Sequence, residues 1–408
     1  MTVSGGPPGS PFGPANLPYG VFSRAGAQPR VGVRLGDHVL DLTVLLGDDT
    51  FAARSLNPFL AQGRARWDEV RARLVAVAGT HLPGNAVHPL DEITLHLPFE
   101  VGDYVDFYAS EHHASNLGRL FRPDAQPLMP NWKHLPVGYH GRAGTVVVSG
   151  AEVVRPCGQR KGPGETAPSY GPSRLLDIEA ELGFVVGIGS PLGSRIAVDD
   201  FAEHVFGAVL VNDWSARDIQ AWEYVPLGPH LGKSFATSVS AWVVPLAALQ
   251  TARVPLPVQD PTPLPYLMGT DDHGYDVDLV VSWNGHDIAW PPYREMYWSP
   301  AQMLAHLTAN GASIRTGDLF ASGTVSGPAR EQRGAFIELT WDGAKPIEVG
   351  GERRTFLEDG DTVSISATAP GPDGARIGFG EVSGTVVPAR TGGGSAAKQP
   401  GPDEPRCQ

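Results

Sequence analysis

Three carboxylates occur at alternate positions of one apolar stretch, LLDIEAELGFVVG, at residues 175–187. Alternate side chains of a β-strand lie on the same face, so Asp177, Glu179 and Glu181 would point one way and the apolar residues between them the other. Two interpretations are open. The segment is either an edge strand with a solvated acidic face, or a strand whose carboxylates surround a cation that offsets their repulsion.

Two further segments place a carboxylate beside groups that could contact a substrate. In DYVDFYASEHHASN, at residues 103–116, Asp106 stands among apolar residues and is followed by His112 and His113. This segment is either an ordinary loop or the wall of a site. In FGAVLVNDWSARDIQ, at residues 206–220, an apolar strand ends at Asp213, which either caps the following helix or serves a site at the strand end.

Together these segments offer four carboxylates: Asp106, Glu179, Glu181 and Asp213. A set of oxygen donors suits a hard cation such as Mg²⁺ or Ca²⁺ better than Zn²⁺. The cysteines are Cys157 and Cys407 alone, which excludes a disulfide framework and a cysteine-rich zinc site and suits a reducing compartment. Spacing by itself does not establish that the three segments meet.

The elements that must position these carboxylates are short. The 408 residues include 50 Gly and 38 Pro, which favours many turns, few long helices and a mixed β-rich (α+β) fold. Near the N-terminus, YGVFS and RVGVRLGDHVLDL are typical of strands with a turn at Gly36–Asp37, and residues 57–78 have helical spacing. Further strands are predicted at TVVVSG, LGFVVGIG, FGAVLVND, SAWVVPL, VDLVVSWNG, AFIELTW, TVSISA and GEVSGTVV.

The chain divides into four parts. Residues 1–15 form a Gly/Pro-rich arm and residues 391–408 a low-complexity tail, and both are expected to be disordered. Residues 16–100 form a small β-rich domain, and residues 101–390 form a larger domain that carries the candidate carboxylates. In that domain, SPAQMLAHLTANG predicts a helix that begins after Ser299 and stops at Gly311.

The charge of the chain argues against several partners. Lys and Arg number 31 and Asp and Glu number 44, so the formal net charge is −13, and no basic block is present. Nucleic acids and anionic membranes are therefore excluded as partners. No apolar run approaches the length of a membrane span, and the N-terminal residues lack the pattern of a signal peptide. We expect a cytoplasmic protein.

Longer blocks tie the candidate residues together. In chain order they are DYVDFYASEHHASN, PNWKHLPVGYHGRAGTVVVSG, RLLDIEAELGFVVG, VLVNDWSARDIQAWEYVPLGPHLGKSF, ASGTVSG and RTFLEDGD. By these blocks the chain resembles the fumarylacetoacetate hydrolase family, from about residue 16 to about residue 389. The E-x-E and D pattern alone would indicate only the wider superfamily, which includes decarboxylases, hydratases and acylpyruvate hydrolases.

The resemblance implies a small SH3-like N-terminal β-barrel and a larger mixed β-roll domain that forms a homodimer. It also implies metal-assisted hydrolysis of a carbon–carbon bond in a dicarboxylate β-diketone, 4-fumarylacetoacetate, to fumarate and acetoacetate, the final step of tyrosine and phenylalanine catabolism. Ca²⁺ or Mg²⁺ would be bound by the family's ligand positions, Asp106, Glu179, Glu181 and Asp213. Asp177 has no ligand role in that pattern.

The resemblance further assigns roles in catalysis. His113, seven residues after Asp106, matches the general base, for which an imidazole is suited, whereas His112 fills a variable position. Glu338, on the predicted strand AFIELTW, would orient that base, although without the resemblance such a glutamate would be expected to face solvent. Residues that match stabilisers of developing negative charge are Arg217, Gln220 and Lys233.

Substrate-binding positions are matched by Tyr108, Arg122, Tyr139, Gln220, Tyr224 and Thr324. Among them, Arg122 can bind a carboxylate with both arms of its guanidinium. A second cation site of the family would involve Lys233 and Thr237 in KSFAT, where Ala236 replaces the glycine of the usual pattern.

Two other functions remain open. The first is a related hydrolase of acylpyruvates or other β-diketones, against which the N-terminal domain and the block NDWSARDIQAWEYVPLGP argue. The second is a non-catalytic metalloprotein that binds a dicarboxylate. A binding protein needs no base, so the presence of His113 and Glu338 beside the carboxylates argues against it.

Overall fold

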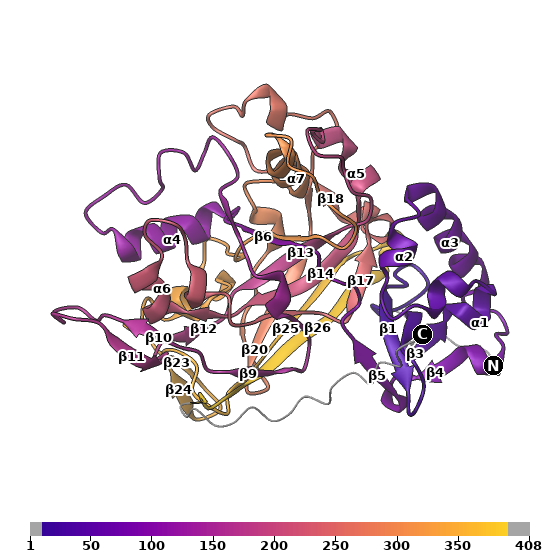
Figure 1. The fold of residues 1–408 in the computed structure, drawn as a ribbon, viewed down its shortest axis with the longest axis horizontal. Coiled ribbons are helices and arrows are strands. Elements are labelled where there is room, and N and C mark those ends of the chain that lie inside the picture. Colours follow the sequence, from indigo (N-terminus) through magenta and orange to yellow (C-terminus); the bar gives the residue numbers. More distant parts are fainter. Residues whose placement is uncertain (1–9, 391–408) are drawn as a thin grey trace, which may run out of the picture.

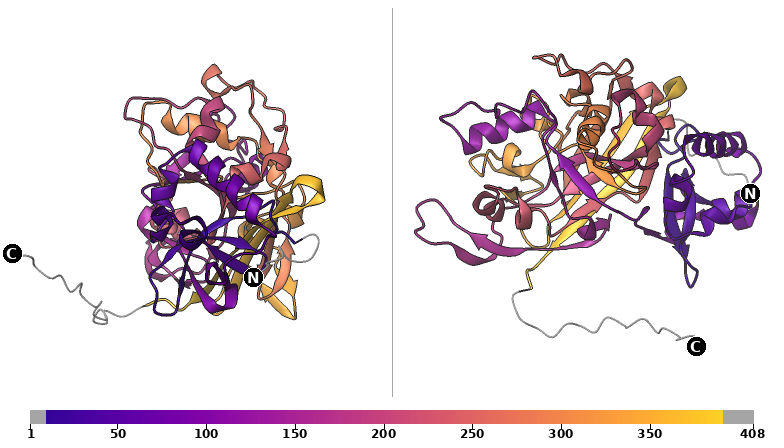
Figure 2. Two further views of the ribbon diagram at one scale, coloured as in Figure 1. Left: turned by 90° about the vertical axis from the view of Figure 1, so that its right-hand side faces the viewer. Right: turned by 45° about the horizontal axis from the view of Figure 1, so that its top comes forward.

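The computed structural model describes residues 10–390, which form a small N-terminal part and a larger part (Figure 1). Figure 2 shows the small part at one end of the molecule. The fold is mixed and β-rich, as predicted. Within the described residues, no helix has the length and apolar composition needed to cross a membrane.

The small part contains five antiparallel strands, in which β4, β3, β2 and β1 are neighbours in that order and β5 also pairs with β1. Their bounds are β1 (Tyr19–Arg24), β2 (Arg30–Leu35), β3 (His38–Asp41), β4 (Val87–Pro89) and β5 (Ile93–His96). The predicted turn at Gly36–Asp37 joins β2 to β3. Helices follow at α1 (Leu42–Leu46), α2 (Asn57–Leu60) and α3 (Arg64–Val77).

The stretch predicted to be helical over residues 57–78 is two helices rather than one. Gly63 separates α2 from α3 and has a φ of +83°, a backbone conformation outside the right-handed helix that glycine adopts readily. The second helix, α3, buries Trp67, Val70 and Leu74 against the rest of the molecule.

The main sheet continues from the small part into the larger part, because β1 pairs with β17. Its strands run in the order β4-β3-β2-β1-β17-β14-β13-β22-β6-β7, and β8 and β16 pair beside β14. The strands of the larger part are β6 (Tyr104–Phe107), β7 (Gly138–His140), β8 (Val146–Val148), β13 (Ala180–Val186), β14 (Val205–Asp213), β16 (Thr237–Val239), β17 (Trp242–Pro245) and β22 (Leu319–Ala321).

A second sheet, ordered β21-β20-β25-β26-β9, packs against the main sheet. It comprises β9 (Glu152–Val154), β20 (Asp278–Trp283), β21 (His286–Ala289), β25 (Thr362–Pro370) and β26 (Arg376–Val387). Its apolar side chains share one buried cluster with those of β13 and β14, and this cluster holds the larger part together. Figure 1 shows the long strands β25 and β26 in yellow.

Short antiparallel pairs complete the sheet structure: β10 (Cys157–Arg160) with β11 (Ser169–Pro172), β12 (Leu176–Asp177) with β15 (Ser215–Ala216), β18 (Arg253–Val254) with β19 (Gly274–Tyr275), and β23 (Ile347–Val349) with β24 (Glu352–Arg354). The helices of the larger part are α4 (Glu111–Phe121), α5 (Phe201–His204), α6 (Arg217–Glu223), α7 (Pro300–Thr308) and α8 (Phe336–Leu339). As predicted, Ser299 caps α7 by accepting a hydrogen bond from the Gln302 amide.

The prediction of a strand at AFIELTW is wrong, because residues 336–339 form the helical turn α8. The alternation of apolar and polar residues is typical of a strand, but here the backbone amides of Phe336 and Ile337 donate to the carboxylate of Asp177. The Leu339 amide donates to the Ala335 carbonyl, which closes the turn. Bonds to a distant side chain therefore override the local pattern.

The predicted terminal segments lie mainly outside the described residues, which exclude residues 1–9 and 391–408. Residues 10–15 are described and form turns that contact both parts. The Gly378 amide donates to the Pro11 carbonyl at 2.8 Å, and the Arg34 guanidinium lies 3.4 Å from the ring centre of Phe12.

Candidate active site

The four candidate carboxylates lie in or next to β14, β13 and β6 of the main sheet, whose order there is β14-β13-β22-β6. Figure 1 shows β6, β13 and β14 close together. Glu181 is the second residue of β13, and Glu179 lies just before that strand. On one side β13 pairs with β14, which ends at Asp213, and on the other side β22 connects β13 to β6, which carries Asp106. The candidate ligand atoms of all four lie within 4.8 Å of one another, and all four residues are buried. The three segments therefore meet.

Two earlier alternatives are wrong. The strand that carries Glu181 is not an edge strand, because β13 has hydrogen-bonded neighbours on both sides. Asp213 does not cap the following helix, because α6 begins after Ala216 and has no side-chain cap. Asp177 does not join the cluster, since β12 ends at Asp177 and β13 begins only at Ala180, so the regular alternation is interrupted between them.

The carboxylate cluster lacks sufficient compensation from the protein. Within residues 10–390, neither carboxylate oxygen of Glu181 has a hydrogen-bond partner, nor does Oδ1 of Asp106. Burial raises the pKa of Glu181 well above its usual value, and the charge of Asp106 raises it further. The pKa of Asp106 is raised by burial and then by Asp213. A cation bound by these oxygens would offset both the cost of burying the carboxylates and their mutual repulsion. The residues therefore fit a hard divalent ion.

Lys233 supplies part of the compensation. Its Nζ donates to Oε2 of Glu179 at 2.5 Å and to Oδ2 of Asp213 at 2.7 Å. Burial alone would raise the pKa of Glu179, but the charges of Lys233 and Arg217 outweigh burial and lower it. Burial alone would lower the pKa of Lys233, and the charges of Asp213 and Glu179 raise it instead. The lysine and Glu179 are therefore both charged.

A buried imidazole–carboxylate pair lies beside the cluster. His113 is in the first turn of α4, whose N-cap Ser110 accepts a hydrogen bond from the His113 amide. Nδ1 of His113 lies 2.6 Å from Oε2 of Glu338, and Nε2 lies 3.8 Å from Oε1 of Glu179. The carboxylate of Glu338 favours the tautomer with hydrogen on Nδ1, which leaves Nε2 able to accept a proton.

Glu338 is held in its ionised form by polar neighbours. Burial alone would raise its pKa, but His113 and hydrogen bonds from Asn116 and Ser326 lower it. Asn116 donates to Oε1 at 2.8 Å, and the Ser326 hydroxyl donates to Oε2 at 2.9 Å. Sequence reasoning missed both residues. Asn116 could have been found, because it follows His113 by one helical turn and so lies on the same face.

His112 is directed elsewhere. Its Nε2 lies 3.7 Å from Oε2 of Glu295, and its side chain is 35% exposed, whereas the side chain of His113 is 2% exposed. Of the two adjacent histidines, His113 alone is paired with Glu338 and lines the cavity described next.

A cavity of about 570 Å³ lies beside His113, which is one of its lining residues. Its wall includes most of the predicted site residues: Asp106, Tyr108, His113, Arg122, Tyr139, Glu179, Arg217, Gln220, Tyr224 and Lys233. The Tyr139 hydroxyl donates to Asp106 at 3.1 Å and to Asp213 at 2.8 Å. The rings of Tyr108 and His113 meet edge to face at 5.3 Å.

The remaining predicted residues lie behind this wall. Thr237 donates to Oδ1 of Asp213 at 3.1 Å, and Thr324 is buried next to Gly323, which lines the cavity. The Thr324 hydroxyl has no partner among the described residues. Glu181, Asp213 and Glu338 likewise do not line this cavity, and all three are buried.

Arg217 presents a guanidinium to the cavity. Its Nε donates to Asp177 at 2.8 Å, and its Nη1 contacts Glu179 at 2.8 Å and Gln220 at 3.2 Å. The Nη2 group is buried and has no partner within residues 10–390. Since Gln220 accepts from Arg217 through Oε1, the Gln220 amide nitrogen remains as a donor for a substrate oxygen.

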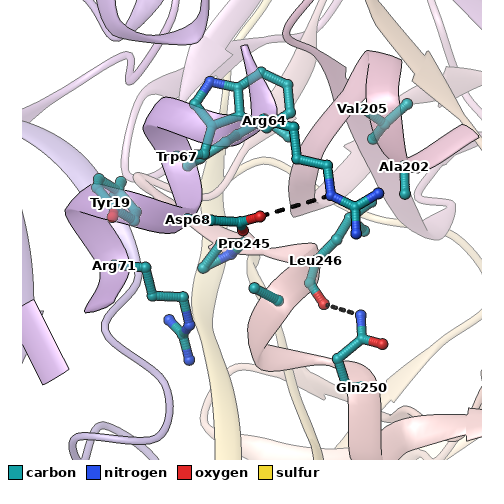
Figure 3. A pocket seen from close by; sticks show the side chains of 12 residues that line it. Tyr19, Arg64, Trp67, Asp68, Arg71, Ala202, Val205, Pro245, Leu246 and Gln250 are labelled. Carbon is teal, nitrogen blue, oxygen red and sulfur yellow. Dashed lines mark hydrogen bonds and ion pairs between the residues drawn. The ribbon is translucent and has the colours of Figure 1, made fainter. Parts of the chain in front are cut away.

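A second cavity, of about 180 Å³, lies between α3 and the larger part (Figure 3). Within it, Nε of Arg64 lies 3.7 Å from Asp68, and Arg71 donates to the Asn16 carbonyl at 2.8 Å. The Gln250 amide donates to the Leu246 carbonyl at 3.0 Å, also drawn in Figure 3. None of the candidate carboxylates borders this cavity, so we assign it to the packing of the two parts.

Comparison with known proteins agrees with this geometry. The family profile described as fumarylacetoacetate (FAA) hydrolase C-terminal matches residues 104–387, and the profile described as fumarylacetoacetase N-terminal matches residues 15–98. The chain belongs to the fumarylacetoacetate hydrolase family.

Curated relatives cover nearly the whole chain. A fumarylacetoacetase of Homo sapiens is 48% identical over 401 residues, which cover 92% of this chain and 96% of that protein. A fumarylacetoacetase of Caenorhabditis elegans is 47% identical over 94% of this chain and 98% of that protein. One from Arabidopsis thaliana is 44% identical over 92% of this chain and 95% of that protein.

Solved structures share the fold. A fumarylacetoacetate hydrolase from psychrophilic Exiguobacterium antarcticum superposes with a TM-score of 0.56 at 17% identity, over 92% of this chain and all of that one. A maleylpyruvate hydrolase from Sphingobium superposes with a TM-score of 0.52 at 18% identity, over 91% of this chain and all of that one. At these identities the likeness concerns the fold alone.

Proposed function

We propose that this enzyme hydrolyses the carbon–carbon bond of 4-fumarylacetoacetate to give fumarate and acetoacetate, the final step of tyrosine and phenylalanine catabolism. The observation that carries the proposal is the convergence of four buried carboxylates beside the His113–Glu338 pair at one cavity. Relatives named fumarylacetoacetase that are 44–48% identical across more than nine-tenths of the chain support the choice of substrate.

The metal ligands in this proposal are Asp106, Glu179, Glu181 and Asp213. Their oxygen-only donor set favours Ca²⁺ or Mg²⁺. When bound, such an ion supplies Lewis-acid polarisation of the diketone oxygens.

His113 acts as the general base. Nδ1 of His113 is held by Glu338 at 2.6 Å, so the lone pair of Nε2 is available to take a proton from water in the cavity that His113 lines. Glu338 stabilises the imidazolium that results, because its own carboxylate is ionised and fixed by Asn116 and Ser326. The resulting hydroxide attacks the substrate carbonyl.

Negative charge then develops on the attacked carbonyl oxygen. As the carbon–carbon bond breaks, this charge passes to the departing acetoacetate enolate, which takes the proton back from Nε2 of His113. The unpartnered Nη2 of Arg217, the amide nitrogen of Gln220 and the ammonium of Lys233 are fixed donors in the same wall. Donors of this kind contribute about 10²–10³ in rate when they are aligned with developing charge.

The substrate carries two carboxylates, and Arg122 is placed to bind one of them. Arg122 lines the cavity, donates through Nη2 to the Pro127 carbonyl at 2.9 Å, and has a buried Nε without a partner in the described chain. We assign contacts along the rest of the substrate to Tyr108, Tyr139, Gln220, Tyr224 and Thr324.

We also infer a second cation site beside the first. A small cavity of about 60 Å³ borders Asp213, Lys233 and Thr237. The Lys233 ammonium, which is paired with two carboxylates, has no lone pair to offer a cation, so Lys233 would bind through its backbone carbonyl. If the carbonyl at position 236 is also used, alanine supplies it as well as glycine would, so Ala236 does not exclude the site.

The organisation that the family resemblance implies completes the proposal. We infer an SH3-like barrel over residues 16–100 and a β-roll catalytic domain over residues 101–390, in a cytoplasmic homodimer. The five antiparallel strands of the small part and the two packed sheets of the larger part support this division.

The direct test is turnover of fumarylacetoacetate by the Ca²⁺- or Mg²⁺-loaded enzyme. Loss of the diketone absorbance measures this turnover. His113→Ala is expected to lower kcat by about 10²–10⁴-fold and to retain metal binding. A fully active His113→Ala would refute the assignment. Higher kcat/KM on simpler acylpyruvates would favour a related hydrolase, and ligand-induced stabilisation without turnover would favour a binding protein.

A further inference from the structure

Asp177 connects the two sides of the candidate active site. Its carboxylate is fully buried and accepts four hydrogen bonds. Oδ2 accepts from Nε of Arg217 at 2.8 Å and from the Ile337 amide at 3.0 Å, and Oδ1 accepts from the amides of Ile178 and Phe336, both at 2.7 Å. One side chain therefore binds an arginine of the cavity wall and the first amides of α8.

The contact with α8 replaces a local helix cap. The N-cap residue of α8 is Ala335, which has no side-chain hydrogen bond. The first amides of a helix lack partners within the helix and are costly to bury unpaired. Asp177 satisfies two of them from 159 and 160 residues away. The position of Glu338, the next residue along, consequently depends on Asp177.

The contact with Arg217 fixes the orientation of a second group, the guanidinium in the cavity wall. With Nε held by Asp177, Nη1 reaches Oε1 of Glu179 and Nη2 remains without a partner in the described residues. Glu179 is in turn the carboxylate that lies 3.8 Å from Nε2 of His113. The two paths from Asp177, through Arg217 and through α8, end on opposite sides of the His113 imidazole.

We propose that Asp177 is a positioning residue that holds the charge-stabilising Arg217 and the base-orienting Glu338 in a fixed mutual arrangement. It neither lines the cavity nor belongs to the carboxylate cluster, so it acts through these two residues. This inference rests on the proposed function, because Arg217 and Glu338 carry their roles only in that reaction.

The test is Asp177→Asn. An asparagine retains the shape of the side chain but offers only one acceptor oxygen. Its NH₂ group would face N–H donors, with which it cannot form hydrogen bonds. We expect kcat to fall about 10–10²-fold, since small displacements of catalytic groups have effects of that size. KM should change much less, and Ca²⁺ binding measured by calorimetry should persist. An unchanged kcat in Asp177→Asn would overturn the proposal.

Asp361→Asn is the matched control. Asp361 is also a buried carboxylate that accepts from an arginine, Arg354, and from a backbone amide, that of Glu358, but it lies outside the site. Both variants are expected to lower the thermal midpoint, and Asp361→Asn should keep the wild-type kcat. If the two variants lose kcat equally, the effect is general destabilisation and the proposal fails.

A double-mutant cycle with Arg217→Gln separates positioning from bulk stability. If Asp177 acts partly through Arg217, Asp177→Asn should lower kcat/KM clearly less in the Arg217→Gln background than in the wild type. Equal losses in both backgrounds would overturn the claim. If wild-type enzyme itself fails to turn over fumarylacetoacetate, the proposed function fails first, and that result is distinct from any outcome for Asp177.

A measurement on the wild type covers the case in which Asp177→Asn does not fold. Hydrogen exchange of the segment that contains Phe336 and Ile337 should be strongly protected in the metal-loaded enzyme, although these amides begin a four-residue helix. Rapid exchange there would show that Asp177 does not hold α8, and would overturn the proposal.

Discussion

Nδ1 of His113 lies 2.6 Å from Oε2 of Glu338, although the two residues are 225 positions apart in the chain. Both are buried, and the carboxylate is also held by Asn116 and Ser326. The contact fixes the ring orientation and leaves Nε2 free to accept a proton, which is the property that the proposed hydrolysis needs from its base.

Replacing this carboxylate should therefore impair the base without removing it. In Glu338→Gln, the amide can donate to Nδ1 and so favours the tautomer with hydrogen on Nε2. We expect kcat to fall by about 10³–10⁴-fold, measured by diketone absorbance. Asn116→Ala removes a single hydrogen bond to Glu338 and should have a much smaller effect. Equal losses in the two variants would contradict the tautomer argument.

Glu181→Gln should separate metal binding from folding. The substitution removes a buried charge whose two oxygens have no partner in the described chain, so the metal-depleted variant is expected to have a higher thermal midpoint than the metal-depleted wild type. Ca²⁺ affinity should fall at least about 10-fold, because even the loss of an outer partner of a ligand has that effect. Calorimetric titration with Ca²⁺ and thermal unfolding in a chelator test both parts.

The raised pKa values of Asp106 and Glu181 predict how stability varies with pH. Burial and repulsion from neighbouring carboxylates raise both pKa values in the folded protein. At pH values between the unfolded and the folded pKa of each group, the folded state therefore binds more protons than the unfolded state. The stability that these groups contribute to the metal-depleted protein should therefore fall as pH rises above about 4, through the raised folded values.

Thermal midpoints with a chelator and with Ca²⁺ test this prediction. Metal must displace protons from the raised carboxyls, so the stabilisation by Ca²⁺ should grow as pH rises. Glu181→Gln serves as the control, since it should show a weaker dependence. A Ca²⁺ effect that stays constant with pH, alike in both proteins, would contradict the assignment.

Arg122→Lys should weaken substrate binding more than it slows the chemical step. A lysine keeps the charge but cannot bind a carboxylate with two parallel hydrogen bonds. We expect KM to rise about 10-fold or more, corresponding to the loss of one charge-assisted hydrogen bond, with a small change in kcat. Steady-state kinetics on fumarylacetoacetate provide the measurement, and an unchanged KM would remove Arg122 from the carboxylate site.

The sequence predicted the strands that carry Glu181 and Asp213 correctly, because their apolar runs and the turns around them are local signals. The convergence with Asp106 was not a local signal. It depends on β22 lying between β13 and β6, with Leu319 opposite Tyr104, and neither spacing nor composition specifies such long-range pairing. At the level of sequence, only the family resemblance connects these residues.

The error at residues 336–339 has a related cause. The local pattern of AFIELTW favours a strand, whereas the amides of Phe336 and Ile337 are bound by a carboxylate from a distant segment. The local sequence likewise does not indicate that the alternation of strand side chains is interrupted between Asp177 and Ala180. In both cases the outcome depends on a partner that only the folded chain brings into contact.

The pairing of β1 with β17 bears on how this enzyme can be shortened. A fragment that began after residue 100 would leave the outer side of β17 without its neighbour, as a bare row of amides and carbonyls open to other chains. Such fragments should aggregate through that edge even though every catalytic group is retained. In the intact chain β1 covers this edge of β17, so we expect that the two parts need to be produced as one polypeptide.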